Sequence, residues 1–225
     1  MTAFQRARSA EQREARRRTI LDTTAAMLDE MPVSEVSLNE LSRRAGLAKS
    51  NVLRYFESRE AILLELLDRA GKQWLAELDE QLSAGIDPDG DARDRGDQFA
   101  AIMAGSLASR RVLCDLLSAQ ASVLEHNVSA EIAARYKRAS LGNIAALAAL
   151  ARRHLPELSE DGSFRVMGMA SVLAGALWPA TRPSASMLAA YETDPALAAM
   201  RLDFAPALRD AVSVIISGTL ARLPT

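Results

Sequence analysis

The sequence predicts an all-α protein with two parts, an N-terminal three-helix domain that contains a helix-turn-helix and a larger helical C-terminal domain. Hydrophobic residues make up 49% of the chain but aromatic residues only 4%, and Ala and Leu, which dominate, favour helices. Apolar residues recur three and four positions apart, and no strand-like alternation or internal repeat is present. The 225 residues can form one large or two modest domains. We expect the division at residues 1–58 and 59–225.

The first predicted helix carries apolar residues at helical spacing and ends before Pro32. The residues at this spacing are Ile20, Leu21, Leu28 and Met31, with Thr24 on the same face. Ahead of the helix lies an arginine-rich arm, residues 2–18. Such an arm can reach DNA phosphates or a minor groove, and a solvated tail explains the same composition equally well.

Residues 36–59, VSLNELSRRAGLAKSNVLRYFESR, have the pattern of two short helices joined by a tight turn. Ser37 is placed to cap the first of them, and Glu40 three residues later completes a capping box. Gly46 lies where the helix must stop and turn, a position that favours a residue free to adopt positive φ.

The second short helix is predicted over residues 49–56. It turns Val52 and Phe56 inward and leaves Ser50, Asn51 and Arg54 outward. Small, polar and basic outward residues suit the major groove of DNA, which admits one helix. The segment is therefore a helix-turn-helix candidate.

The segment AGLAKSNVLRYFESREAIL resembles the DNA-binding signature of the tetracycline-repressor-like transcriptional regulators. In that signature a small-residue turn leads into a Lys-containing recognition helix, an aromatic pair ends the helix, and a Ser-Lys/Arg-Glu step opens the next one. The close match covers residues 17–67, and the rest of the chain matches only in its helical layout. The resemblance implies DNA contacts at Ser37, Lys49, Ser50, Asn51, Arg54, Tyr55 and Arg59.

The chain departs from this signature at two positions. The family usually has a phosphate-contacting Tyr where this chain has Leu53, and Tyr55 is the candidate to replace that contact. The family usually has Ser or Thr where this chain has Ala48, so the recognition helix lacks its common N-cap.

A long helix is predicted from Ser58 to Ser83, followed by a loop rich in Asp and Gly at residues 85–97. Further helices are predicted at about 98–105, 107–124, 127–154, 161–182 and 204–223, with a short one near 195–200. The helix at 161–182 is apolar nearly all round and must be covered on all sides. The resemblance implies that this helix and the last one form a four-helix dimer interface. We expect the last helix to contribute Val212, Ile215, Ile216 and Thr219, and internal core is the alternative interpretation.

Two amides, Gln120 and Asn143, lie on otherwise apolar helical stripes. A buried amide is costly unless it is hydrogen-bonded, so each is bonded to a neighbouring backbone group or faces a cavity. The resemblance implies that this domain senses a small molecule. The predicted cavity is lined by Leu117, Gln120, Tyr136, Asn143, Met167 and Trp178.

Charge and cysteine content narrow the functional class. Residues 1–59 carry 11 Lys/Arg against 8 Asp/Glu, and residues 60–225 carry 16 against 21, so the basic part coincides with the helix-turn-helix. Cys114 is the only cysteine and is expected to be a small buried residue, with a redox sensor as the less favoured interpretation. We expect no disulfide, metal, cofactor, secretory signal or membrane span, and a cytoplasmic location.

The leading prediction is a homodimeric repressor-type transcription factor that binds double-stranded operator DNA and is released by a small hydrophobic ligand. The alternative is a helical scaffold or ligand carrier that uses its helix-turn-helix for protein contacts. The polar, outward set on the second helix favours DNA over a protein partner. An enzyme has no support, because we find no catalytic grouping or cofactor motif that the sequence would bring together.

Overall fold

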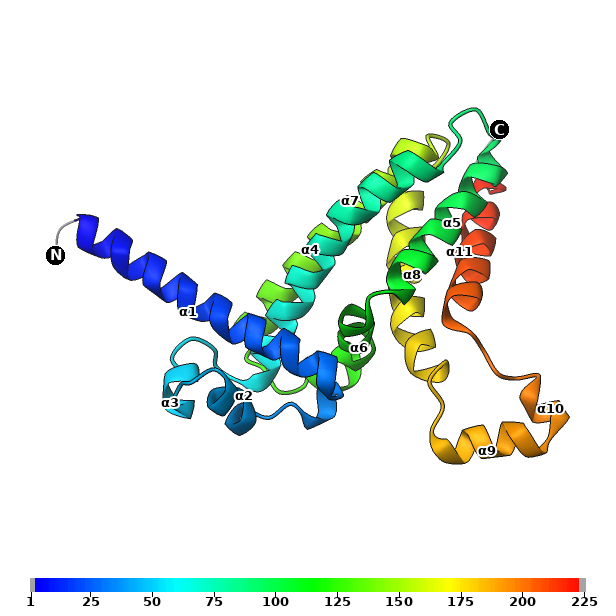
Figure 1. The fold of residues 1–225 in the computed structure, drawn as a ribbon. Coiled ribbons are helices and arrows are strands. Elements are labelled where there is room, and N and C mark those ends of the chain that lie inside the picture. Colours follow the sequence, from blue (N-terminus) through cyan, green and yellow to red (C-terminus); the bar gives the residue numbers. More distant parts are fainter. Residues whose placement is uncertain (1–2, 223–225) are drawn as a thin grey trace.

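The computed structural model describes residues 3–222, and Figure 1 shows a chain of helices. The predicted all-α class is confirmed, and no strand occurs in the part of the chain that is described. In chain order the elements are α1 (Ala3–Glu30), η1 (Val33–Glu35), α2 (Leu38–Arg44), α3 (Lys49–Val52), α4 (Arg59–Gly85), α5 (Ala92–Ala108), α6 (Arg111–Ala119), η2 (Gln120–Leu124), α7 (Ala130–His154), α8 (Glu160–Ala180), α9 (Ala185–Thr193), α10 (Pro195–Ala198) and α11 (Phe204–Leu220).

Serine side chains fix where several of these helices begin. The Ser58 hydroxyl accepts a hydrogen bond from the Ala61 amide at 3.1 Å, and Ser129 and Ser159 cap α7 and α8 in the same way. The predicted start of α5 at residue 98 is wrong. The carboxylate of Asp91 accepts from the amides of Arg93 and Asp94, so the helix begins at residue 92 and the loop before it is shorter.

The predicted helix 107–124 is interrupted. The chain leaves α5 at Ala108 and restarts at Arg111, and beyond Ala119 the helix widens into a π-turn. In that turn the Glu125 amide donates to the carbonyl of Gln120, five residues earlier. The wider turn changes the direction in which Gln120 and its neighbours project.

The C-terminal helices pack around a continuous apolar core. Helix α4 lies along α7 and α5, α8 packs on α6 and α7, and α11 packs on α5 and α8 (Figure 1). Cys114 is fully buried here, and desolvation raises the pKa of its thiol to about 12. No helix within residues 3–222 is both long and apolar enough to cross a membrane.

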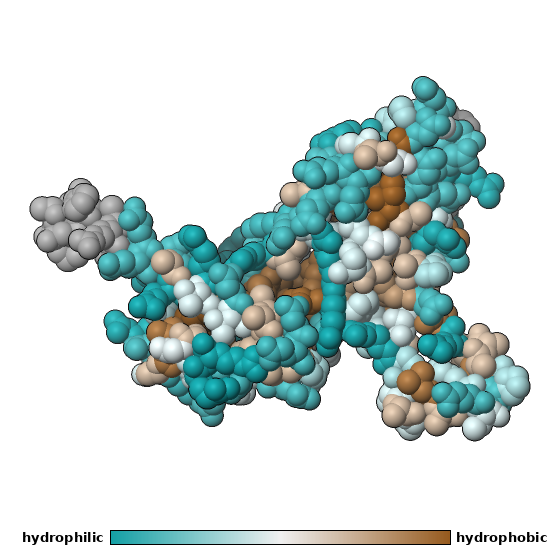
Figure 2. Space-filling view, in the orientation of Figure 1, coloured by the Kyte–Doolittle hydropathy of each residue, from teal (hydrophilic) through white to brown (hydrophobic). Residues whose placement is uncertain are grey.

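Two segments project from this body. Residues expected to form a loose basic arm instead continue α1 as one long helix, which extends outward in Figure 1. Helix α9, which was not predicted, and α10 form a second projection that buries no residue. Figure 2 shows apolar side chains over this second projection, where Met187, Leu197 and Met200 are exposed.

Candidate nucleic-acid interface and cavity

The helix-turn-helix is built from α2, a tight turn and α3. The Ser37 hydroxyl accepts from the Glu40 amide at 3.2 Å, as a cap should, and Gly46 has φ of 65° in the turn. The reciprocal half of the capping box is absent, because the Glu40 carboxylate accepts from Arg43 and Arg44 instead. Hydrogen bonds from these two guanidinium groups hold the pKa of Glu40 at about 2.

Helix α3 is shorter than predicted. It ends at Val52, and the next residues form a turn in which the Tyr55 amide donates to the Val52 carbonyl. Val52 and Phe56 are buried, as predicted. Ala48 precedes the helix without a side-chain cap, which confirms the departure from the usual signature.

The predicted contact residues divide between the surface and the interior. Ser37, Lys49, Ser50, Asn51 and Arg54 are exposed, and Tyr55 is half-buried. Leu53, at the position where the resembling family has Tyr, is also exposed. Within the described part of the chain, neither Lys49 nor Arg54 has an ion-pair partner, so both charges are available to an external group.

The expectation for Arg59 is wrong, because this side chain is directed inward. Its guanidinium donates to the backbone carbonyls of Val33 and Val36 and pairs with Glu60. These bonds satisfy the carbonyls of the first residue of η1 and of the residue that follows η1, and tie that turn to the start of α4. Arg59 therefore stabilises the fold, and all three of its guanidinium nitrogens already donate within the protomer.

The arginines of α1 have two different roles, which the sequence did not distinguish. Arg17 donates to the Tyr55 carbonyl at 2.6 Å, pairs with Glu65 and stacks over the Phe56 ring at 4.3 Å, so it fixes the turn after α3 against α1 and α4. Arg13 and Arg16 are exposed. Together with Gln12, Thr19, Arg54 and Tyr55 they line a cleft of about 720 Å³ between α1 and the residues after α3.

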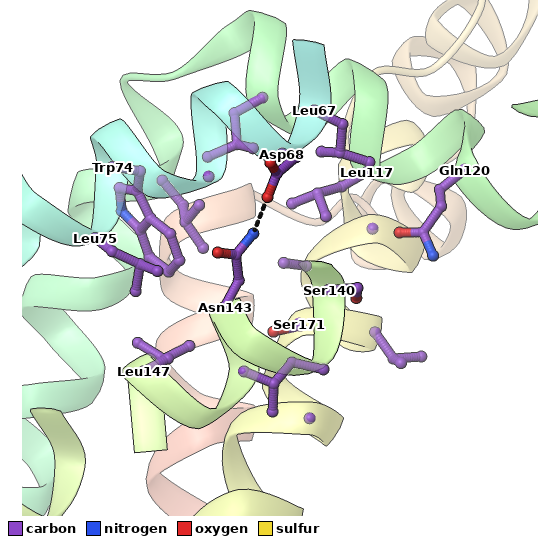
Figure 3. A pocket seen from close by; sticks show the side chains of 18 of the residues that line it. Leu67, Asp68, Trp74, Leu75, Leu117, Gln120, Ser140, Asn143, Leu147 and Ser171 are labelled. Carbon is purple, nitrogen blue, oxygen red and sulfur yellow. Dashed lines mark hydrogen bonds between the residues drawn. The ribbon is translucent and has the colours of Figure 1, made fainter. Parts of the chain in front are cut away.

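A second cavity, of about 530 Å³, lies between α4, α6, α7 and α8. Four of the six predicted lining residues line it: Leu117, Gln120, Tyr136 and Asn143. Most of the remaining wall is apolar, including Leu67, Trp74 and Leu147 (Figure 3). Burial raises the pKa of Tyr136, which keeps its phenol neutral.

Neither cavity amide is bonded to the backbone. Asn143 Nδ2 donates to Asp68 Oδ1 at 3.0 Å, and Gln120 Nε2 donates to Glu125 Oε1 at 2.8 Å. Asp68 also accepts from Lys72 Nζ at 2.7 Å. Both amides are therefore held by carboxylates. Figure 3 shows Asp68 and Asn143 pointing toward each other at the wall of the cavity.

Met167 and Trp178 do not line this cavity. Met167 is fully buried in the core. Trp178 packs edge-on against Phe204, with ring centroids 4.9 Å apart, and its indole N–H donates to Asp115 at 2.6 Å. The tryptophan that does line the cavity is Trp74 of α4, whose indole donates to the Ser106 hydroxyl at 3.1 Å.

Two of the four predicted interface residues of α11 also need correction. Val212 and Ile216 are fully buried inside the protomer, with Ile216 close to Gly96 of α5, and Ile215 and Thr219 are half-buried. The spacing of apolar residues marked the face of α11 that packs on α5 and α8. On the outward faces, Val214 of α11 is 71% exposed and Val172 of α8 is 72% exposed.

Family models match almost the whole described chain. Residues 20–66 match the bacterial regulatory proteins of the tetR family, and residues 68–223 match the tetracyclin repressor-like C-terminal domain. The chain belongs to the tetracycline-repressor-like family. The predicted family is thereby confirmed.

The curated relatives include the HTH-type transcriptional regulator EthR of Mycobacterium tuberculosis, which is 39% identical over 54 residues, 24% of this chain. The matched segment spans only a quarter of that relative's length. Similar folds occur in a TetR regulator from Rhodococcus sp. RHA1 (TM-score 0.56, 13% identity, 94% and 98% of the two chains) and in FadR of Bacillus subtilis, solved with stearoyl-CoA (TM-score 0.55, 14% identity, 89% and 97%). At these identities the likeness concerns the fold alone.

Proposed function

We propose that this chain is a DNA-binding transcriptional regulator that acts as a homodimeric repressor and is released by a small hydrophobic ligand. The observation that carries the DNA-binding part is the exposed, polar and basic surface of the helix-turn-helix. Lys49, Asn51 and Arg54 project from α3 and the turn after it, over a buried apolar base. A corner used for protein contacts would more often expose apolar side chains there.

The side chains on this surface are of two kinds, one suited to base edges and one suited to phosphates. Amide and guanidinium groups can form paired hydrogen bonds with base edges in the major groove, which suits Asn51 for adenine and Arg54 for guanine. Lys49 is suited to a phosphate, and so are the exposed arginines of α1 that line the cleft beside Arg54.

The homodimer is proposed from the outward faces of α8 and α11, which contact each other within the protomer. Met169 and Val172 are exposed on α8 and Val214 on α11, so both helices expose apolar surface. Pairing this surface with a second copy would bury it and would present two recognition helices to the DNA. Two copies one helical turn apart, about 34–36 Å, read the two halves of a palindromic site.

The ligand role is proposed from the cavity and from the path of α4. This helix begins at the end of the helix-turn-helix and supplies Leu67, Asp68 and Trp74 to the cavity wall. A ligand that binds one tilt of α4 better than another would change the spacing of the recognition helices. Equal affinity for both arrangements would have no effect on DNA binding.

Selection of bound DNA from random duplexes tests the function as a whole. We expect one enriched palindromic sequence, bound with an affinity that falls linearly with log salt, each phosphate contact adding about 0.9 to the slope. Asn51→Ala should lose about 1–3 kcal/mol on the selected site and relax preference at one position. Enrichment of no sequence, together with binding unaffected by Asn51→Ala and Lys49→Ala, would overturn the DNA-binding proposal.

A further inference from the structure

Asp68 is a charged group on the wall of an otherwise mostly apolar cavity. It lies on the inward side of α4, and its side chain is 21% exposed. One carboxylate oxygen accepts from Asn143 and the other from Lys72. Each carboxylate oxygen has a second lone pair, so both can still accept from a guest molecule.

Asn143 lies opposite Gly71 of α4. A Cβ at Gly71 would lie 3.4 Å from Asn143 Nδ2, an ordinary contact distance, so the amide packs closely between α4 and α7. The hydrogen bond from this nitrogen to Asp68 fixes the orientation of the amide. Figure 3 shows its oxygen turned away from Asp68, and no donor within residues 3–222 bonds to it. The pair therefore presents two kinds of acceptor, and its one remaining donor is the second N–H of the Asn143 amide.

The positive charge that also lines the cavity belongs to Lys137, and like the Asp68 carboxylate it already has an ion-pair partner. The Lys137 ammonium donates a hydrogen bond to Glu125 Oε1 at 2.7 Å, and Gln120 Nε2 donates to the same oxygen. Burial favours a higher pKa for Glu125, but the hydrogen bonds from Lys137 and Gln120 outweigh it and lower the pKa. Glu125 thus stays ionised, and it takes one N–H from each of two groups that would otherwise attract an anionic ligand.

From these contacts we infer that the cavity selects an apolar molecule ending in an amine over a carboxylate of the same length. The amine would donate to Asp68 and to the Asn143 oxygen while its chain contacts the apolar wall. A carboxylate would meet Asp68 with like charge in a site of low dielectric, where the repulsion is strong. This inference rests on the proposed ligand-binding function and names the chemical class that the site takes.

Three ten-carbon probes, decylamine, decanol and decanoate, test the inference below their micelle-forming concentrations. The chain has two tryptophans, and Trp178→Phe leaves Trp74 as the reporter inside the cavity. We expect decylamine to quench or shift Trp74 emission at the lowest concentration, decanol next and decanoate last. Because hydrogen bonds to charged groups are strong, the amine should bind at least about tenfold more tightly than the carboxylate.

Asp68→Asn in the same background should reduce the amine-to-carboxylate ratio by at least about tenfold. Asp79→Asn is the matched control, because Asp79 is also an ion-paired carboxylate on α4 but pairs with Arg153 outside the cavity. The control should keep the probe ranking. If Asp68→Asn fails to fold, the ranking on the Trp178→Phe protein still decides the inference.

Equal affinities for the three probes, or tightest binding of decanoate, would overturn the inference and leave the cavity as a ligand site of another class. No response to any probe by Trp74 emission and by thermal unfolding would overturn both the inference and the proposed ligand function. The two failures are therefore distinguishable in one set of measurements.

Discussion

At the scale of single residues, the partner of each basic side chain separates a structural role from a recognition role. Arg17 and Arg59 both donate to backbone carbonyls of the N-terminal helices and pair with carboxylates. Lys49 and Arg54 are exposed and unpaired within the described residues. The first pair should matter for folding and the second for DNA.

Replacing Arg59 and Lys49 by Ala should give opposite phenotypes. Arg59→Ala removes the donors to the Val33 and Val36 carbonyls, so the free energy of unfolding should fall by about 1–3 kcal/mol. Lys49→Ala should change that free energy by less than about 0.5 kcal/mol but weaken binding to all DNA sequences alike. Urea denaturation and DNA titration measure the two effects, and unchanged stability in Arg59→Ala would contradict the inward role.

His154 should make stability depend on pH. Its Nε2 is buried without a partner in the described structure, and burial together with the nearby Arg153 lowers the pKa of the imidazole. The folded state then binds fewer protons than the unfolded state, whose imidazole titrates near the usual value of about 6.5. The contribution of His154 to the free energy of unfolding is therefore fully present above that pH, and it is lost as the pH falls below it. His154→Gln should show a smaller drop in unfolding free energy between pH 7.5 and 5.5 than the parent, and an identical drop would contradict the assignment.

At the scale of elements, the close approach of α6 and α8 depends on one glycine. A Cβ at Gly175 would lie 3.0 Å from the carbonyl oxygen of Leu117, a backbone atom that cannot turn aside as a side chain would. The two helices both line the cavity, so their separation also sets its width.

Gly175→Ala should therefore lower the free energy of unfolding by about 1–3 kcal/mol, because α6 and α8 must move apart. Gly105→Ala in α5 is the matched control, since a Cβ there meets no atom within 4 Å and the residue is exposed. Alanine has the higher helix propensity, so the control should be stabilised by about 0.5–1 kcal/mol. Equal effects in the two variants would mean that the contact at residue 175 does not limit the packing.

At the scale of the whole molecule, the proposed dimer surface and the cavity share helix α8. Val172 lines the cavity and is also exposed on the outward face of the helix. A ligand that moves α8 would therefore act on the subunit boundary as well as on α4. Both routes change the relative placement of the two helix-turn-helix units in a dimer.

A charge on the outward face of α11 should separate the subunits without unfolding them. Val214→Glu places a carboxylate at a side chain that is 71% exposed in the protomer, so the fold tolerates it, whereas burial in a dimer leaves the charge unpaired. We expect the parent to sediment as a dimer at micromolar concentration, and the variant as a folded monomer with weakened operator binding. A variant that remains dimeric would place the interface elsewhere, and a monomeric parent would contradict the homodimer.

The sequence by itself determined the helical class, the helix-turn-helix and the starts of α4, α8 and α11 to within one residue, because these depend on local chemistry. Ser58, Ser129 and Ser159 bond to amides three residues ahead whatever packs around them. The sequence also located the apolar stripes and placed two amides, Gln120 and Asn143, at the cavity.

Only the tertiary structure decided which neighbour each stripe meets. The face of α11 that carries Val212 and Ile216 packs on the protomer's own helices, and a period of 3.6 residues cannot distinguish that from contact with a second copy. The inward direction of Arg59, the bond of Trp178 to Asp115 and the pairing of Asp68 with Asn143 join residues 26 to 75 positions apart. Such contacts follow from how helices cross, which depends on side-chain shape along both partners and not on the spacing within either one.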